Sequence, residues 1–166
     1  MHVKELFDLG GKVAIVTGGT GIYGTPISEA LAEAGALVII ASRNKGRCEE
    51  WAAELAGRGL QAKGEGFDQG DMDSIAALAE RVTREHGAVD ILVNNAGITT
   101  RATRLHEMPL ESWNEVVAVN LTGVFLCTRA VIPQMLEAGG GSIINISSIL
   151  GLAGHYPDLP MANICY

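Results

Sequence analysis

The sequence has little that would mark a metalloprotein, a disulfide scaffold or a nucleic-acid binder. Its three cysteines, Cys48, Cys127 and Cys165, are far apart, and there is no CxxC pair or histidine–cysteine cluster. We therefore expect no metal site and a reducing compartment, the cytoplasm. The net charge of -7 argues against nucleic acid as a partner, because proteins that bind it carry a basic face.

The chain also lacks a recognisable targeting segment. Its N-terminal stretch MHVKELFDLGGK is charged and has no apolar h-region, so no secretory signal is predicted. No unbroken apolar run reaches the roughly 20 residues that span a bilayer, and we expect a soluble protein without membrane association. Aromatic residues make up only 5%, whereas hydrophobic residues reach 48% and glycines number 21. This composition suits a single α/β domain over residues 1–166.

Short apolar runs alternate along the chain with stretches of helical spacing. The predicted strands are 12–17, 36–42, 61–67, 89–97 and 141–148, and the predicted helices are 26–35, 45–59, 71–87 and 110–139. We expect the last helix to bend near Pro133. The strands lack strict polar alternation and are separated by helices, which indicates parallel strands buried on both faces. The sequence thus predicts a doubly wound, Rossmann-like α/β fold with ligands at the carboxyl ends of its strands.

A glycine-rich segment, VTGGTGIYG, lies where the first strand meets the first helix. Glycines at this junction let the backbone turn sharply and let a pyrophosphate approach the helix N-terminus. Gly18, Gly21 and Gly24 are regularly spaced, but Ile22 takes the place of the usual middle glycine. Gly19 and Gly21 remain, so the segment predicts phosphate binding along a shifted loop path. The alternative is a tight turn with no ligand.

The segment after the second strand, ASRNKGR, contains no acidic residue that would read a ribose 2′-hydroxyl. Ser42 and Arg43 stand there instead, and Lys45 and Arg47 add positive charge. Because arginine pairs with phosphate, we favour NADP(H) over NAD(H), which stays possible. The alternative to a phosphate-binding role is that Arg43 is only a solvated turn residue. Asp68, after the third strand, is expected to meet the adenine amino group or to cap the next helix.

The motifs VTGGTGIYG, LVNNAG, VVAVNLTGVF and GSIINISS occur in this order, and the chain resembles the short-chain dehydrogenase/reductase family of the classical type. The resemblance implies that Asn94, Ala96 and Gly97 support the adenosine side of the cofactor. It also implies that Asn120 binds water in a proton relay and that Ser148 holds the substrate oxygen. Ser147 is a rival of Ser148 for holding the substrate oxygen. The alternative for Asn120 is a polar core residue whose side chain is satisfied by backbone. Relatives usually form dimers or tetramers, so a homo-oligomer is expected.

The resemblance also implies a catalytic tyrosine with a lysine four residues later, one helical turn away. Tyr156 is followed by Pro160 in HYPDLP, so we assign the role to Tyr166. No lysine follows Tyr166 in the sequence. We therefore expect these 166 residues to be part of a longer chain that also carries the family's last two strands, and to be poorly stable and inactive alone.

The function that we expect is NADP(H)-dependent interconversion of a ketone and a secondary alcohol. The substrate could be a sugar, a sugar acid, a polyol or a 3-oxoacyl compound. Loops 98–109 and 151–165 would form the substrate wall, where Arg101 and Arg104 could attract an anion or simply be solvated. The alternative is a non-catalytic nucleotide-binding or interaction protein with the same fold, which would bind the cofactor without turnover.

Overall fold

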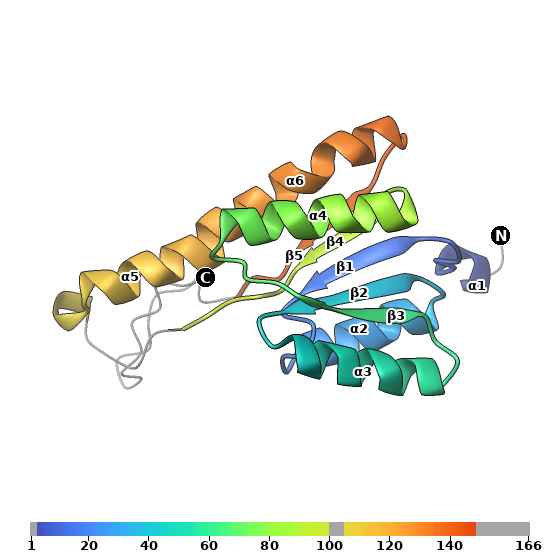
Figure 1. Ribbon diagram of the computed structural model, residues 1–166, viewed down its shortest axis with the longest axis horizontal. Helices are drawn as coiled ribbons and strands as arrows, with labels where there is room; N and C mark the ends of the chain where they lie inside the picture. Colours follow the sequence, from blue (N-terminus) through green and yellow to red (C-terminus); the bar gives the residue numbers. More distant parts are fainter. Residues whose placement is uncertain (1–2, 100–104, 149–166) are drawn as a thin grey trace.

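A computed structural model describes residues 3–99 and 105–148, and within them the chain forms one five-stranded parallel sheet. The strand order is β3-β2-β1-β4-β5, with each strand parallel to its neighbours (Figure 1). The strands are β1 (Val13–Thr17), β2 (Leu37–Ser42), β3 (Ala62–Gly66), β4 (Ile91–Asn94) and β5 (Ser142–Asn145). This arrangement confirms the predicted doubly wound fold, and the order reverses between β1 and β4, where such sheets bind their ligands.

The helices connect successive strands and cover both faces of the sheet. They are α1 (Val3–Leu6), α2 (Gly24–Glu33), α3 (Lys45–Gly57), α4 (Met72–His86), η1 (Leu105–Glu107), α5 (Leu110–Val117), η2 (Ala118–Gly123) and α6 (Val124–Glu137). Figure 1 shows α2 and α3 on one face of the sheet and α4 and α6 on the other. The predicted helices are present, with ends that differ by a few residues, as expected for boundaries read from sequence.

Strand β1 lies at the centre of the core and sends side chains to both faces. Val13 and Ile15 pack with residues of α4 and α6, whereas Ala14 and Val16 pack with residues of α2 and α3. All five residues of β1 are buried, because successive side chains of a strand point to opposite faces and both faces are covered here. The continuous apolar run KVAIVT is explained by this position.

The segment Leu110–Glu137 is helical throughout, and its hydrogen bonding changes in the stretch before Pro133. Residues Ala118–Gly123 form a π-helical segment, η2, and Pro133 lies inside α6. A π-helical turn contains an additional residue and often occurs at a functional site. The sequence indicated the length of the helix but not this change of hydrogen bonding, because no residue type in the segment marks a π-helical turn.

The same segment bears on the expectation that no part of the chain spans a membrane. Within residues 3–99 and 105–148, Leu110–Glu137 is the one helix whose length and apolar composition would allow it to cross a bilayer. Scattered polar residues such as Asn120 and Arg129 interrupt the apolar run while leaving the helix apolar on average. Val131 and Met135 pack in the core of the domain, so part of this apolar character is explained by packing on the sheet.

Strand β5 lies at an edge of the sheet and is more exposed than its apolar sequence suggested. It ends at Asn145, and Ile144 and Ile146 remain 42% and 44% exposed. It pairs with β4 on one side. The predicted strand 141–148 is therefore shorter in the structure, and the serines that follow it are in a loop rather than in a strand.

Candidate functional site

The turn between β1 and α2 is held tightly by its glycines. Gly18 has a positive φ of 63°, and a Cβ on Gly24 would lie 2.0 Å from the carbonyl oxygen of Gly18. Side chains at these positions would therefore open the turn. The N-cap residue of α2, Tyr23, makes no side-chain capping bond. The amide of Thr25 donates to the carbonyl oxygen of Gly21 at 3.0 Å, and no side chain competes with an anion at this helix N-terminus, where the helix dipole favours negative charge.

A buried hydroxyl joins this turn to the segment that follows β4. Thr17, only 1% exposed, accepts hydrogen bonds through Oγ1 from the amides of Asn95 and Ala96, at 3.1 and 3.0 Å. Asn95 donates through Nδ2 to the carbonyl oxygens of Thr17 and Gly18, at 3.0 and 3.1 Å. These bonds cross between two neighbouring parallel strands, so they fix the position of the NNAG segment against the glycine turn.

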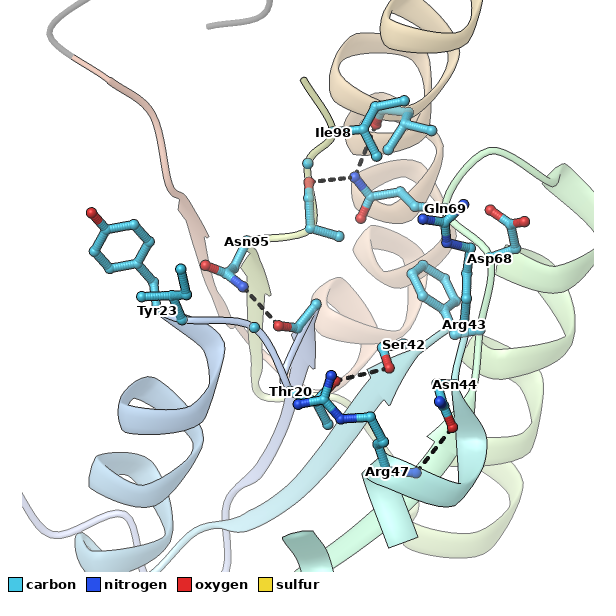
Figure 2. A pocket seen from close by; sticks show the side chains of 17 residues that line it. Thr20, Tyr23, Ser42, Arg43, Asn44, Arg47, Asp68, Gln69, Asn95 and Ile98 are labelled. Carbon is cyan, nitrogen blue, oxygen red and sulfur yellow. Dashed lines mark hydrogen bonds between the residues drawn. The ribbon is translucent and has the colours of Figure 1, made fainter. Parts of the chain in front are cut away.

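A cleft of about 490 Å³ lies above the carboxyl ends of β1, β2 and β3 (Figure 2). Residues predicted to bind the cofactor line it: Gly18, Gly21, Ile22, Ser42, Arg43, Asp68, Ala96 and Gly97. Gly19 and Gly24 are buried behind the turn and shape it from within. The residues predicted to bind the cofactor thus lie together along this cleft, which we call the nucleotide cleft after their predicted role.

Asp68 keeps its carboxylate at the cleft and does not cap α4. Its Oδ1 accepts from the amide of Gly70 at 2.9 Å, whereas the cap of α4 is Asp71, which accepts from the amide of Asp73. The alternative role considered for Asp68 belongs to Asp71. Asp68 is left on the cleft lining, where a carboxylate can accept a hydrogen bond from an adenine amino group.

A second cleft, of about 670 Å³, adjoins the first at the carboxyl ends of β4 and β5. Asn120, Ser147 and Ser148 line it. The two clefts share one wall, formed by Tyr23, Asn95, Ala96, Gly97 and Ile98. An elongated ligand that enters the nucleotide cleft can therefore reach the serines past this wall.

Asn120 lies in the π-helical segment and holds the backbone of Ile98. Its Oδ1 accepts from the Ile98 amide and its Nδ2 donates to the Ile98 carbonyl, both at 2.8 Å. An asparagine inside a helix is mildly unfavourable, and this pair of bonds explains its presence. The Asn120 side chain is thus satisfied by backbone, which was the alternative role considered for it. It also fixes the wall that the two clefts share.

The structure places Asn94, Ser147 and Ser148 differently from the expectation. Asn94 lines only the second cleft, whereas its neighbour Asn95 lines both clefts. Its Nδ2 donates to Asn145 at 2.9 Å and to Thr128 at 3.3 Å. We expected only one of Ser147 and Ser148 to face the site, but β5 ends before them and both line the cleft.

Several of the assigned positions lie outside the described residues. Tyr166 and its rival Tyr156 fall there, as do Arg101, Arg104 and the loop 151–165.

Gln69 is a site residue that the sequence reasoning did not identify. It is 3% exposed, and its Nε2 donates to the carbonyl oxygens of Ala96 and Val119, at 3.0 and 2.9 Å. The side chain therefore links the NNAG segment to the π-helical segment (Figure 2). The one signal was a polar residue next to Asp68, after the third strand, and the sequence analysis assigned it no role.

Comparison with known proteins identifies the family of this chain. Residues 12–158 match the short chain dehydrogenase family. This chain belongs to the short-chain dehydrogenase/reductase family. One relative within the family is cis-4-hydroxycyclohexanecarboxylate dehydrogenase from Sinomonas cyclohexanicum, 41% identical over 143 residues, which are 86% of this chain and 57% of that protein.

Another relative is D-threitol dehydrogenase from Mycolicibacterium smegmatis, 42% identical over 142 residues, 86% of this chain and 54% of that protein. The chain thus spans a little over half the length of these short-chain dehydrogenases. Among solved structures, a metagenomic short-chain oxidoreductase in complex with NADP superposes with a TM-score of 0.85 at 38% identity. That match covers 93% of this chain and 69% of the other.

Proposed function

We propose that this protein is an NADP(H)-dependent oxidoreductase that interconverts a ketone and a secondary alcohol. The observation that carries the proposal is the wall shared by the two clefts. A dinucleotide lying along the glycine turn would extend past Gly97 and Ile98 toward Ser148. Both relatives described above are dehydrogenases named for hydroxylated substrates, which supports a secondary alcohol as one side of the reaction.

The residues present fit a dinucleotide. The glycine turn has no room for a Cβ at Gly24, and the N-terminus of α2 has no side-chain cap where a pyrophosphate would lie. Arg43 and Arg47 line the part of the cleft next to β2, which favours a 2′-phosphate. The bound cofactor supplies or accepts a hydride. NAD(H) is the alternative cofactor.

The protein's own residues would position the substrate and move its proton. Ser148 donates a hydrogen bond to the substrate oxygen, and Asn120 holds Ile98 and the wall beside it. Tyr166 is proposed to exchange the proton with that oxygen. A free tyrosine, with a pKa of about 10, needs a nearby positive charge to act near neutral pH.

We also propose a cytoplasmic homo-oligomer. The two cysteines in the described part of the chain, Cys48 and Cys127, are free and buried, as expected in a reducing compartment. A stripe of exposed apolar side chains along α5, η2 and α6 supports self-association. The substrate class beyond a small carbonyl or alcohol compound would be found by a panel of sugars, sugar acids, polyols and 3-oxoacyl compounds.

The test is a fluorescence titration of the full-length protein with NADPH and NADH, followed by turnover of that panel. We expect NADPH to bind more tightly and at least one substrate to be turned over. Ser148→Ala should lower kcat by about a hundredfold or more while leaving the Kd for NADPH unchanged, since the serine lies outside the nucleotide cleft. Tight binding of NADPH without turnover of any substrate would favour the non-catalytic reading.

A further inference from the structure

The side-chain amide of Gln69 joins two segments that line the clefts. Gln69 is 3% exposed, and its Nε2 donates to the carbonyl oxygen of Ala96 at 3.0 Å and to that of Val119 at 2.9 Å (Figure 2). The reverse orientation of the amide would set its oxygen against two carbonyl oxygens, so the two acceptors fix which way the amide faces. Both hydrogens of the amide are thus used to hold backbone.

The backbone around Gln69 also lies directly against the π-helical segment η2. A Cβ on Gly123, the last residue of that segment, would collide with the carbonyl oxygen of Gln69 and lie 2.6 Å from its Cγ. A Cβ on Gly70 would lie 3.4 Å from a methyl group of Val119. The bond from Nε2 to Val119 is therefore part of a close contact between positions that are 50 residues apart in the chain.

A second amide, that of Asn120, joins the same two segments beside the other cleft. It holds the amide and the carbonyl of Ile98, both at 2.8 Å. Val119 lines the nucleotide cleft, whereas Asn120 lines the second cleft. The two amides thus hold consecutive residues of η2 against the stretch 96–98, and a displacement of Val119 is passed to Asn120 through one peptide unit.

The oxygen of the Gln69 side chain argues that this amide is not placed for stability alone. Its Oε1 is buried and has no hydrogen-bond partner among residues 3–99 and 105–148. An unpaired buried acceptor costs free energy, and local costs of this kind concentrate at functional sites. The benefit that offsets the cost is the pair of bonds made by Nε2.

We propose that Gln69 is a positioning residue for the reaction, which acts through η2 on Asn120 and on the wall that the two clefts share. The inference rests on the proposed oxidoreductase function and adds one residue to it. Without the two Nε2 bonds, Asn120 alone would hold η2 to the stretch 96–98, and the wall between the two clefts would shift. A displacement of about 1 Å at a positioning group can lower a rate about a hundredfold.

The first experiment measures kcat of the full-length protein at saturating cofactor and substrate, so that changes in binding do not contribute. Gln69→Met removes the amide at nearly constant length and should lower kcat about tenfold to a hundredfold. Gln69→Asn keeps an amide that is one methylene too short to reach both carbonyl oxygens, and its kcat should fall between those of wild type and Gln69→Met. It also provides a milder variant if Gln69→Met does not fold.

The matched control is Gln134→Met, which separates positioning from stability. The Oε1 of Gln134 also joins separate elements, because it accepts from the hydroxyl of Thr83 and from the amide of Val89, the latter at 3.3 Å. Gln134 lies outside the lining of both clefts. This variant should lose thermal stability to a similar extent and keep kcat within about twofold of wild type.

A double-mutant cycle with Asn120→Ala tests the path of the effect. If Gln69 acts through Asn120, the double variant should lose no more kcat than the more damaging single variant, within about twofold. Two residues that act independently would instead give losses that multiply.

Amide hydrogen exchange at Ile98 gives a readout that needs no turnover. The hydrogen of this amide is held by Asn120, so Gln69→Met should speed its exchange about tenfold, as expected when a local opening becomes easier. Gln134→Met should leave the exchange at Ile98 unchanged.

The outcomes separate this inference from the proposed function. A wild-type protein without turnover would overturn the proposed function, and exchange at Ile98 would then decide by itself whether Gln69 positions the wall. With an active wild type, a normal kcat in Gln69→Met would overturn the inference alone. Equal losses of kcat in Gln69→Met and Gln134→Met would assign the effect to stability, and multiplying losses in the double variant would contradict a path through Asn120.

Discussion

Thr17 joins the glycine turn to the segment after β4 through a single buried hydroxyl. Its hydroxyl accepts from two amides and donates to the carbonyl of Val93 at 3.4 Å, so all its hydrogen-bonding capacity is used. It is the last residue of β1 and is buried beneath the glycine turn. A polar residue that ends an otherwise apolar strand was visible in the sequence, but its partners were 78 and 79 residues away.

Replacing Thr17 by valine, which has nearly the same shape, tests this network. The amides of Asn95 and Ala96 would lose their acceptor, and we expect the free energy of unfolding to fall by about 2 kcal/mol, the usual penalty for unpaired buried groups. Binding of NADPH should weaken as well, because the NNAG wall is no longer fixed. Chemical denaturation and cofactor titration measure the two effects.

Thr17→Ser is the matched control for that variant. It keeps the hydroxyl and removes only a methyl group, so it should retain most of the stability and the cofactor affinity. A loss of stability in the serine variant without a loss in the valine variant would mean that packing of the methyl group, rather than hydrogen bonding, is what Thr17 contributes.

At the scale of elements, the sheet and the two clefts differ in how far they could be predicted. The strands β1, β2 and β4 were predictable because a continuous apolar run between helices is typical of a strand buried on both faces of a parallel sheet. The clefts depend on single side chains that cross between elements, such as Gln69 donating to Val119 of the π-helical segment. Such contacts leave no periodic pattern in the sequence.

The site residues whose predicted and observed positions differ depend on such local details. Asn94 and Asn95 are adjacent and chemically identical, so only the register of β4 decides which of them faces the nucleotide cleft. The length of β5 likewise decides whether Ser147 and Ser148 are in a strand or in a loop. Arg43 precedes α3, which starts at Lys45, whereas Arg47 lies in its first turn, and sequence reading places such a boundary only within a few residues.

An ion pair at the amino ends of β1 and β4 predicts how stability changes with pH. Asp90 accepts from Lys12 Nζ at 2.8 Å and from the amide of Val13 at 2.9 Å. Partial burial alone would raise the pKa of the Asp90 carboxyl, but these two hydrogen bonds hold it below its ordinary value of 3.8. The pair therefore contributes stability above that pH, and the contribution is lost as the pH falls through the lower, folded-state pKa.

We expect Asp90→Asn to destabilise the protein at pH 7 and to flatten the loss of stability below about pH 4. Denaturant unfolding of wild type and variant at pH 7, 5 and 3 measures the difference, which should shrink as the pH falls. Glu111→Gln, an exposed change elsewhere, is the control and should leave the pH profile unaltered. A difference between wild type and Asp90→Asn that stays constant with pH would contradict the role of the carboxylate charge.

At the scale of the whole molecule, several of the large exposed apolar side chains lie on one long helical segment. Leu121, Phe125 and Leu136 are 68%, 60% and 73% exposed, and Ile132 is 40% exposed. Their spacing places them on one side of the helix η2–α6. A monomer seldom exposes so many large apolar residues together, and this stripe is the expected contact for self-association.

Phe125→Asp should therefore weaken self-association. Loss of a central aromatic contact at an interface typically costs about 2 kcal/mol, roughly thirtyfold in the dissociation constant. Light scattering coupled to size-exclusion chromatography would show a smaller mass for the variant than for the wild type at equal concentration. Met72→Asp, at the exposed start of α4, is the matched control and should keep the wild-type mass. The same mass for wild type and Phe125→Asp would exclude this stripe as the contact.

The bonds from Thr17 to the NNAG segment have a consequence for the energetics of the whole protein. Because they join β1 to the end of β4, the nucleotide cleft exists only after those two distant strands have paired. The unfolded chain then has no affinity for the dinucleotide, and every bound molecule stabilises the native state alone. Cofactor at a hundred times its Kd should raise the free energy of unfolding by about 2.7 kcal/mol. The melting temperature of this protein would thus report the concentration of its cofactor.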